Sequence, residues 1–253
     1  MTVANPTILK RLNNNHKILI SIIKLIKDLA FILYPNYCRS CGLILDNTNE
    51  IICFECRLQL PFTDFHELSD NPVERLFYGR IPLFSATAMF RFRKEGSIQV
   101  ILHSLKYHND PKIGVVLGRQ YGLILREEPR FNTCTMILPV PLHPQRERKR
   151  GYNQSLKFAE GLSQSMGIPV YSDILVKQIK TETQTRKSAF KRWENVKTVF
   201  SLLSSERLAN QHVLLVDDVI TTGSTLESCA QLLMNESNCS ISIASIALAG
   251  HSF

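Results

Sequence analysis

The second half of the chain alternates short apolar runs with amphipathic stretches. Thr135 to Val140 and His212 to Val216 are apolar runs that predict buried strands, and Ile241 to Leu248 predicts a final strand. Because helical stretches separate these runs, the pattern predicts a parallel α/β sheet with helices on both faces. The expected helices run from Asn153 as N-cap to about Met166, and from Ser224 to about Asn235.

The first half of the chain is less regular. Leu83 to Phe92 has strand character with partial alternation of apolar and polar positions. Apolar residues then recur at helical spacing between Ile98 and Leu105, and a second helix is expected over about 112–126. Residues 61–82 contain Asp, Asn and Pro and predict an irregular connector, while Val170 to Val176 is only weakly strand-like.

The N-terminal region carries a strongly apolar run from Ile18 to Leu33. Lys24, Lys27 and Asp28 interrupt it before it reaches the roughly 20 clean residues that a membrane span needs. No small-residue cleavage site follows, which disfavours a signal peptide. Two interpretations stay open: an amphipathic helix that packs on the protein's own body, or an interfacial helix on an anionic membrane.

Composition narrows the class of protein. The 253 residues are 44% hydrophobic and 21% charged, which excludes collagen-like and largely disordered chains. The 30 Lys and Arg against 22 Asp and Glu give a net charge of +8, and a basic surface favours nucleic acid, phosphorylated metabolites or anionic lipid. The odd number of cysteines, seven, supports a cytoplasmic location.

Four cysteines form a compact motif, Cys38-Arg-Ser-Cys41 and Cys53-Phe-Glu-Cys56. Each CxxC turn brings two thiolates towards one ion, and two such turns supply the four soft ligands of a structural zinc site. Four thiolates leave no open position for catalysis. Disulfides, or an iron cluster on the same four ligands, are the alternatives. The remaining cysteines lie in apolar surroundings and are expected to be buried small hydrophobes: Cys134, Cys229 and Cys239.

A second motif follows the apolar run that begins at Val213. Asp217 and Asp218 come at the carboxyl end of the expected strand, where open α/β sheets bind ligands. The next residues form a turn with hydroxyls beside a helix N-terminus, a combination that favours a monophosphate. Carboxylates suit ribose hydroxyls or a metal-linked sugar, and a phosphate next to a diol predicts a ribose 5-phosphate site. Its members are Asp217, Asp218, Val219, Ile220, Thr221, Thr222, Gly223, Ser224 and Thr225.

Plain structural interpretations exist for the parts of this motif. Ser224-Thr-Leu-Glu227 fits an ordinary capping box, and an Asp pair after a strand can belong to a plain loop.

The run from Val213 to Thr225 resembles the phosphoribosyl-diphosphate (PRPP) loop of the type I phosphoribosyltransferases. The wider pattern, over about residues 35–250, is similar to the ComF/GntX family. It comprises the four-cysteine ribbon, Leu105-Lys-Tyr107, Leu138-Pro-Val-Pro-Leu-His143, Arg150-Gly-Tyr-Asn-Gln154, Thr183-Gln-Thr185 and Arg192-Trp-Glu-Asn-Val196. Pattern and resemblance together divide the chain into an N-terminal amphipathic helix (1–35), a four-cysteine zinc ribbon (36–60), a connector (61–82) and a phosphoribosyltransferase-like domain (83–253).

The resemblance implies roles for these residues. Asp217 and Asp218 match the pair that grips the ribose hydroxyls, and Val219 to Thr225 matches the 5-phosphate cradle. Residues 178–196 take the place of the mobile loop that covers the substrate in the enzymes. Magnesium would accompany PRPP. In many of these enzymes the N-terminal segment forms a hood that recognises the base. Here that segment is the ribbon and helix, so the resemblance identifies neither the acceptor nor an enzymatic activity. The diphosphate loop would comprise Pro139 to His143 with Arg146, Arg148, Lys149 and Arg150.

Basic segments also suit single-stranded DNA. Residues 146–150 carry a net charge of +3, and residues 177–197 carry seven Lys or Arg against two Glu. Tyr152, Phe190 and Trp193 lie in or beside these segments, and cationic side chains with interleaved aromatics favour single strands. The alternative is a diphosphate loop plus a solvated helix face, with the aromatics in the core. His103, His108 and His143 lack metal-ligand spacing, and His143 is a weak candidate for a phosphate contact.

Two functions follow. The first is a cytosolic competence protein that handles incoming single-stranded DNA on a phosphoribosyltransferase scaffold. The second is an active, magnesium-dependent phosphoribosyltransferase that acts on PRPP. A third possibility is that the ribbon and N-terminal helix dock a membrane transporter, or a competence or replication protein.

Overall fold

The computed structural model describes residues 21–46, 50–177 and 200–250, apart from Lys24, Lys27, Asp28 and Ala30. The chain divides into two compact units, Met1–Cys53 and Phe54–Phe253. Each unit is described by itself.

In the first unit, the described residues between 21 and 33 are helical, as expected for the part of the apolar run that the structure describes. Their large apolar side chains are exposed, from 45% for Ile23 to 74% for Ile32. Tyr37 and Ile44 form an antiparallel bridge around the first pair of cysteines. Among the described residues, no helix combines the length and apolar character needed to cross a bilayer.

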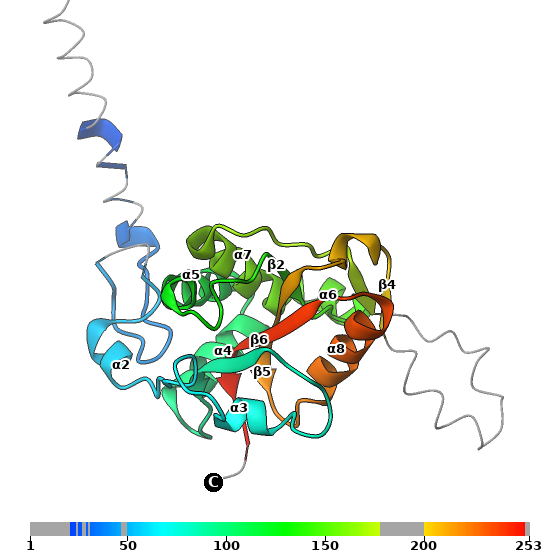
Figure 1. Ribbon diagram of the computed structural model, residues 1–253. Coiled ribbons are helices and arrows are strands. Elements are labelled where there is room, and N and C mark those ends of the chain that lie inside the picture. The colour runs from blue at the N-terminus through cyan, green and yellow to red at the C-terminus, as the bar shows by residue number, and fades with distance from the viewer. Residues whose placement is uncertain are drawn as a thin grey trace, which may run out of the picture. The chain divides into compact units, whose positions relative to one another are not determined.

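The second unit contains a four-stranded parallel sheet (Figure 1). Its strand order is β1 (Ser85–Arg91), β6 (Ser240–Leu248), β5 (His212–Ile220) and β2 (Met136–Pro139). All three strand pairs are parallel, so the predicted parallel α/β sheet is confirmed. All four strands were expected from their apolar runs.

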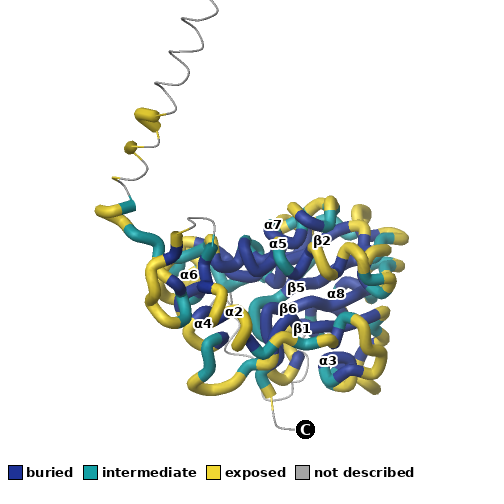
Figure 2. Tube along the Cα trace, turned by 90° about the vertical axis from the view of Figure 1, so that its left-hand side faces the viewer, coloured by how far each residue is buried: buried dark blue, intermediate teal, exposed yellow. Residues whose placement is uncertain are grey.

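Both faces of the sheet are buried (Figure 2). Along β5, Val213 and Leu215 join a core cluster that includes Leu226, Cys229 and Leu233 of α8 (Ser224–Glu236). Leu214 and Val216, on the other face of β5, are fully buried as well, and α7 (Gln154–Met166) packs against β5 and β2. The chain therefore fills both faces with apolar side chains, as parallel strands require.

Two helices pack unusually closely. α5 (Lys112–Glu127) carries three glycines at four-residue spacing, and α7 carries Gly161. A Cβ at Gly118 would lie 2.1 Å from the carbonyl oxygen of Phe158, and one at Gly161 would lie 2.2 Å from that of Val115. Only glycine permits this separation of the helix backbones. α4 (Ser97–Tyr107) precedes α5 and matches its predicted helix.

Other elements differ from expectation. β5 continues through Asp217 and Asp218 to Ile220, because Val219 and Ile220 pair with β6. Residues 144–150, expected as part of a loop, form α6 (Pro144–Arg150), which proline begins and left-handed Gly151 ends. In the segment 170–176, Val170 makes only a bridge to Ile137. The remaining elements are α2 (Phe54–Leu58), the 3-10 helix η4 (Glu206–Leu208), and the antiparallel pair β3 (Leu175–Lys177) and β4 (Phe200–Leu202).

The segment 61–82, expected as an irregular connector, contains α3 (Pro72–Arg75). Asn71 caps this helix by accepting hydrogen bonds from the backbone of Val73 and Glu74. Phe77, 1% exposed, belongs to the same core cluster as β5 and α8. The segment is thus part of the folded core, and it reaches the loop described next.

Candidate functional site

The acidic pair and the hydroxyl-rich turn lie at the carboxyl end of β5, at the start of α8. The first backbone N–H groups of a helix have no partner within the helix, and the helix dipole is positive there. A small pocket of about 30 Å³ is lined by Asp217 and by Val219 to Leu226. The structure therefore brings together the two halves of the predicted motif; ligand binding there stays a prediction.

Gly223 fixes the turn in two ways. Its φ of +76° lies in the left-handed region that favours glycine, and it is the N-cap residue of α8. A Cβ at this position would lie 2.9 Å from the ring of Phe77. The backbone of Thr222 also accepts a hydrogen bond from Arg80, at 3.0 Å. Residues of the segment 61–82 thus hold the turn in place.

The hydroxyl groups of the turn are accessible. Thr221, Thr222, Ser224 and Thr225 are exposed, and the Thr222 and Ser224 oxygens lie 3.0 Å apart. The capping-box interpretation of Ser224 and Glu227 is wrong, because the N-cap position is Gly223 and no side chain caps the helix. Glu227 instead forms an ion pair with Arg80.

Asp217 and Asp218 have different partners. Asp217 Oδ1 accepts hydrogen bonds from the Ser155 hydroxyl and the Asp218 backbone, both at 2.8 Å. Burial, and secondly the neighbouring Asp218 charge, raise the pKa of Asp217 to about 7. Asp218 Oδ2 lies 2.9 Å from Lys106 Nζ, in an ion pair whose side chains are 15% and 25% exposed. The pair is thus anchored by two elements distant in sequence.

The role of these anchors was missed from the sequence. Lys106 lies within the quoted run Leu105-Lys-Tyr107, but nothing local indicates that it pairs with Asp218. Ser155 is a first-turn residue of α7, whose expected cap is confirmed: the Asn153 side chain accepts from the Ser155 backbone at 3.0 Å. That cap directs the start of α7 towards β5.

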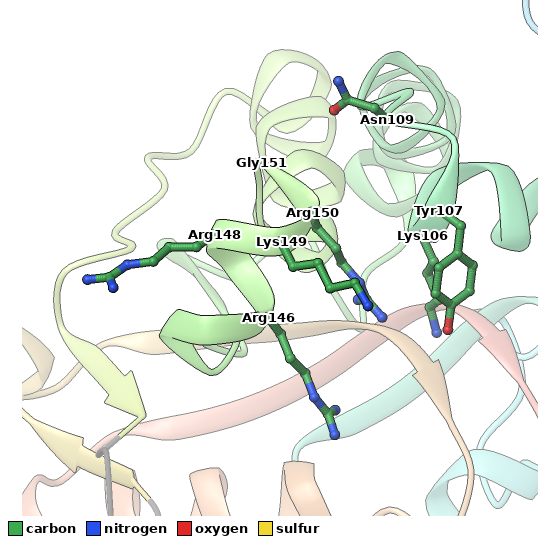
Figure 3. Close-up of a pocket in the computed structure, with 8 residues that line it drawn as sticks. All are labelled: Lys106, Tyr107, Asn109, Arg146, Arg148, Lys149, Arg150 and Gly151. Atoms are coloured by element: carbon green, nitrogen blue, oxygen red, sulfur yellow. The ribbon is translucent and has the colours of Figure 1, made fainter.

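A larger cavity, of about 690 Å³, adjoins the acidic pair through Lys106 (Figure 3). Arg146, Lys149 and Arg150 extend from α6 towards the side of Lys106 and Tyr107, whereas Arg148 points away. These are mostly exposed side chains on a seven-residue helix. The predicted basic pentapeptide is therefore a helical wall of a cavity. Its lining comprises Lys106, Tyr107, Asn109, Arg146, Arg148, Lys149, Arg150 and Gly151.

One contact ties the two walls of this cavity to each other, and a second holds Arg150 at the start of α7. Tyr152, after α6, donates its hydroxyl hydrogen to the carbonyl of Leu105 in α4. Arg150 donates to Gln154 at 2.6 Å. Tyr152 is 8% exposed, so it belongs to the core and cannot stack on a base as one interpretation of the sequence proposed. Phe190, Trp193, the expected mobile loop at 178–196 and most of the basic segment 177–197 lie outside the described residues.

His143 caps a helix. It is the N-cap of α6, and its Nδ1 accepts a hydrogen bond from the Gln145 backbone at 3.2 Å. A phosphate contact through the rest of the ring stays a prediction.

The four-cysteine motif forms one cluster. The sulfurs of Cys38, Cys41, Cys53 and Cys56 lie within 4.8 Å of one another. Cys41 and Cys53 sulfurs are 3.7 Å apart, too far for a disulfide but close to the roughly 3.8 Å that two ligands at a tetrahedral zinc would show. Burial raises the pKa of Cys38, but backbone hydrogen bonds from Cys41, Cys53 and Ser40 outweigh it and lower the pKa to about 6. The donor set fits a metal ion.

The lone cysteines behave largely as expected. Cys134 and Cys229 are buried, and burial raises the pKa of the Cys134 thiol to about 12 and that of Cys229 further. Cys239 is only partly buried.

Comparison with known proteins gives consistent matches. A family model described as a phosphoribosyl transferase domain matches residues 152–252. Competence protein F of Haemophilus influenzae is 36% identical over 140 residues, 54% of this chain and 61% of the relative. The DNA utilization protein YhgH of Salmonella typhimurium is 31% identical over 149 residues, 58% of this chain and 65% of the relative. The matched regions therefore span less than two thirds of these relatives.

Among solved structures, glutamine phosphoribosylpyrophosphate amidotransferase from B. subtilis matches with a TM-score of 0.40 at 18% identity, over 56% of this chain and 30% of that chain. The parallel sheet and the four-cysteine cluster are consistent with the family model and the curated relatives. The chain is therefore similar to competence protein F and its relatives, and its residues 152–252 match a phosphoribosyl transferase domain.

Proposed function

We propose that this chain binds a phosphoribosyl group, as PRPP or a nucleotide, and acts in the handling of single-stranded DNA in the cytoplasm. One observation carries the first part: an acidic pair and a hydroxyl-rich turn meet at the sheet edge where α8 begins. In this arrangement the carboxylates accept hydrogen bonds from the ribose hydroxyls. The exposed hydroxyls and the N–H groups of α8 donate to the 5-phosphate.

The second part of the proposal rests on charge and on the relatives. The basic helix α6 lines a cavity that Lys106 connects to the acidic pair. A row of cations beside a phosphate site suits a ligand with several phosphates, such as a nucleic-acid strand. Two relatives are named a competence protein and a DNA utilization protein.

Calorimetry with ribose 5-phosphate, and ribose as the unphosphorylated control, tests the phosphoribosyl site. Thr221→Val with Thr225→Val removes two hydroxyls at nearly constant volume, so we expect affinity for ribose 5-phosphate to fall about tenfold or more. Thr135→Val is the matched control, because this exposed threonine lies at the opposite end of the parallel sheet. Equal binding of ribose and ribose 5-phosphate, or no loss in the double variant, would contradict the proposal.

A second candidate function is transfer of the phosphoribosyl group. The cavity of about 690 Å³ beside the acidic pair gives space and positive charge for a leaving diphosphate, which favours it. The test is release of diphosphate from PRPP with magnesium in the presence of nucleobases. PRPP binding without diphosphate release over a panel of acceptors would leave binding alone as the function.

We further propose that the cysteine cluster holds a structural zinc ion. The four thiols provide a complete tetrahedral donor set, so the metal would stabilise the local fold and leave no open position. We expect about one zinc per chain by elemental analysis, lost in Cys38→Ser and retained in the control Cys239→Ser. Iron with visible charge-transfer absorption in place of zinc would support the iron alternative.

A further inference from the structure

We propose that the cavity between the end of α4 and α6 binds single-stranded DNA, and that Tyr107 stacks on an unpaired base there. This inference deepens the proposed function and rests on it. Among the described residues that line the cavity, Tyr107 is the aromatic one, and 64% of its surface is exposed.

Tyr107 belongs to a row of exposed rings on α4 and its C-terminal turn. The His103 ring centroid lies 4.7 Å from that of Tyr107 and 5.2 Å from that of His108. All three residues are exposed. The His103 plane is inclined by 40° to that of Tyr107 and by 79° to that of His108, so the rings adjoin without forming one flat surface. Tyr107, the largest of the three rings, is the one on which a base would stack.

Cations lie beside Tyr107 in a way that suits a phosphodiester backbone. Arg150 places its guanidinium carbon 5.5 Å from the Tyr107 ring centroid, and Figure 3 shows Arg146 and Lys149 on the same side of α6. Stacking rings with adjacent Lys and Arg is the combination by which proteins bind single strands without sequence preference. The base of a paired duplex would not be free to stack on Tyr107.

The geometry is set before any ligand binds. Tyr152 ties the α6 wall to Leu105, two residues before Tyr107, and Gln154 holds Arg150. The end of α4 and the Arg150 guanidinium therefore keep their places without help from the ligand, which lowers the entropy cost of binding. Lys106 joins this cavity to the acidic pair, so a strand in it would run beside the phosphoribosyl site.

The decisive measurement is fluorescence anisotropy with a labelled oligothymidylate about 20 nucleotides long, titrated at several salt concentrations. We expect Tyr107→Ala to weaken binding about tenfold and Tyr107→Phe to stay within about twofold of wild type, because stacking needs the ring alone. Tyr78→Ala is the matched control: Tyr78 is 58% exposed and does not line the cavity.

The salt dependence separates stacking from phosphate contacts. Tyr107→Ala should leave the slope of log affinity against log salt unchanged. Arg146→Gln with Lys149→Gln should reduce the slope by about 1.4, because each lost phosphate contact in a single strand removes about 0.7. Arg75→Gln with Arg126→Gln, two exposed arginines outside the cavity, should leave affinity nearly unchanged.

Three results would overturn the inference. They are no measurable binding of the oligothymidylate, binding that Tyr107→Ala leaves intact, or equal affinity for duplex DNA of the same length. Ribose 5-phosphate binding, measured in parallel, tells the two proposals apart. If wild type binds the sugar phosphate but not the strand, the inference fails and the phosphoribosyl site stands.

Discussion

Asp217→Asn combined with Asp218→Asn should reduce affinity for ribose 5-phosphate, and for PRPP with magnesium, at least about 100-fold. Each carboxylate is proposed to accept a hydrogen bond from a ribose hydroxyl, and a hydrogen bond to a charged group contributes about 1.5–3 kcal/mol. At about pH 8, above the pKa of about 7 at Asp217, the loss follows because each amide keeps the shape but carries no charge. Calorimetry measures it, and Asp173→Asn is the control, since Asp173 is an exposed partner of Arg207.

The variant should remain folded, and its stability should respond to pH in a defined way. The folded protein holds a proton on Asp217 more tightly than the unfolded chain does, because burial and Asp218 raise that pKa to about 7. Wild-type stability should therefore fall as pH rises from about 4 to about 7. Asp217→Asn should remove this part of the pH dependence. Full ligand affinity in a folded double variant would contradict the site assignment.

Gly118→Val should destabilise the protein by about 3 kcal/mol or more, or prevent it from folding. The new Cβ would lie 2.1 Å from the Phe158 carbonyl oxygen, a backbone atom that cannot rotate away, so α5 and α7 must separate. Intrinsic helix propensity alone would predict that the substitution stabilises α5, since glycine is a poorer helix former than valine. A lower free energy of unfolding would therefore reflect the packing of α5 against α7. Urea denaturation measures it.

Arg119→Val supplies the control for this substitution. It places the same β-branched side chain at the next, exposed position of α5, and should cost well under 1 kcal/mol. If Gly118→Val is as stable as this control, the claim that α5 and α7 pack too closely for a Cβ at position 118 is contradicted. A partly destabilised, folded Gly118→Ala should also bind ribose 5-phosphate more weakly, because α7 carries Ser155, the partner of Asp217.

The sequence predicts correctly those features that depend on residues close together in the chain. The apolar runs of β2, β5 and β6 predict buried strands because each residue on them has to leave water. Asn153 caps α7 as its side chain predicts, and the two CxxC turns bring four sulfurs together over a short stretch of chain. A turn ending at Gly223 was also expected, since glycine tolerates the left-handed backbone, but β5 continues through Val219 and Ile220 where the turn was expected to begin.

Two local sequence patterns did not lead to the observed structure. One indicated a helix that was not predicted, and the other indicated a helix cap that does not form. Proline at the start and glycine at the end of residues 144–151 indicate a short helix, but the resemblance to the phosphoribosyltransferases implied a diphosphate loop there. Glu227 has the spacing of a capping box, yet the structure pairs it with Arg80, which comes from the expected connector. A distant cation therefore decided the orientation of that carboxylate.

The sequence by itself determined the four strands of the parallel sheet, the helices α4, α5, α7 and α8, the four-cysteine cluster and the acidic turn, because these depend on periodicity, capping and backbone freedom over a few residues. Only the tertiary structure decided which side chains complete the site. Lys106 meets Asp218, Ser155 meets Asp217, and Tyr107 stays exposed while Tyr152 is buried. These choices follow from how α4, α6 and α7 pack at one end of the sheet, and long-range packing has no signature in neighbouring residues.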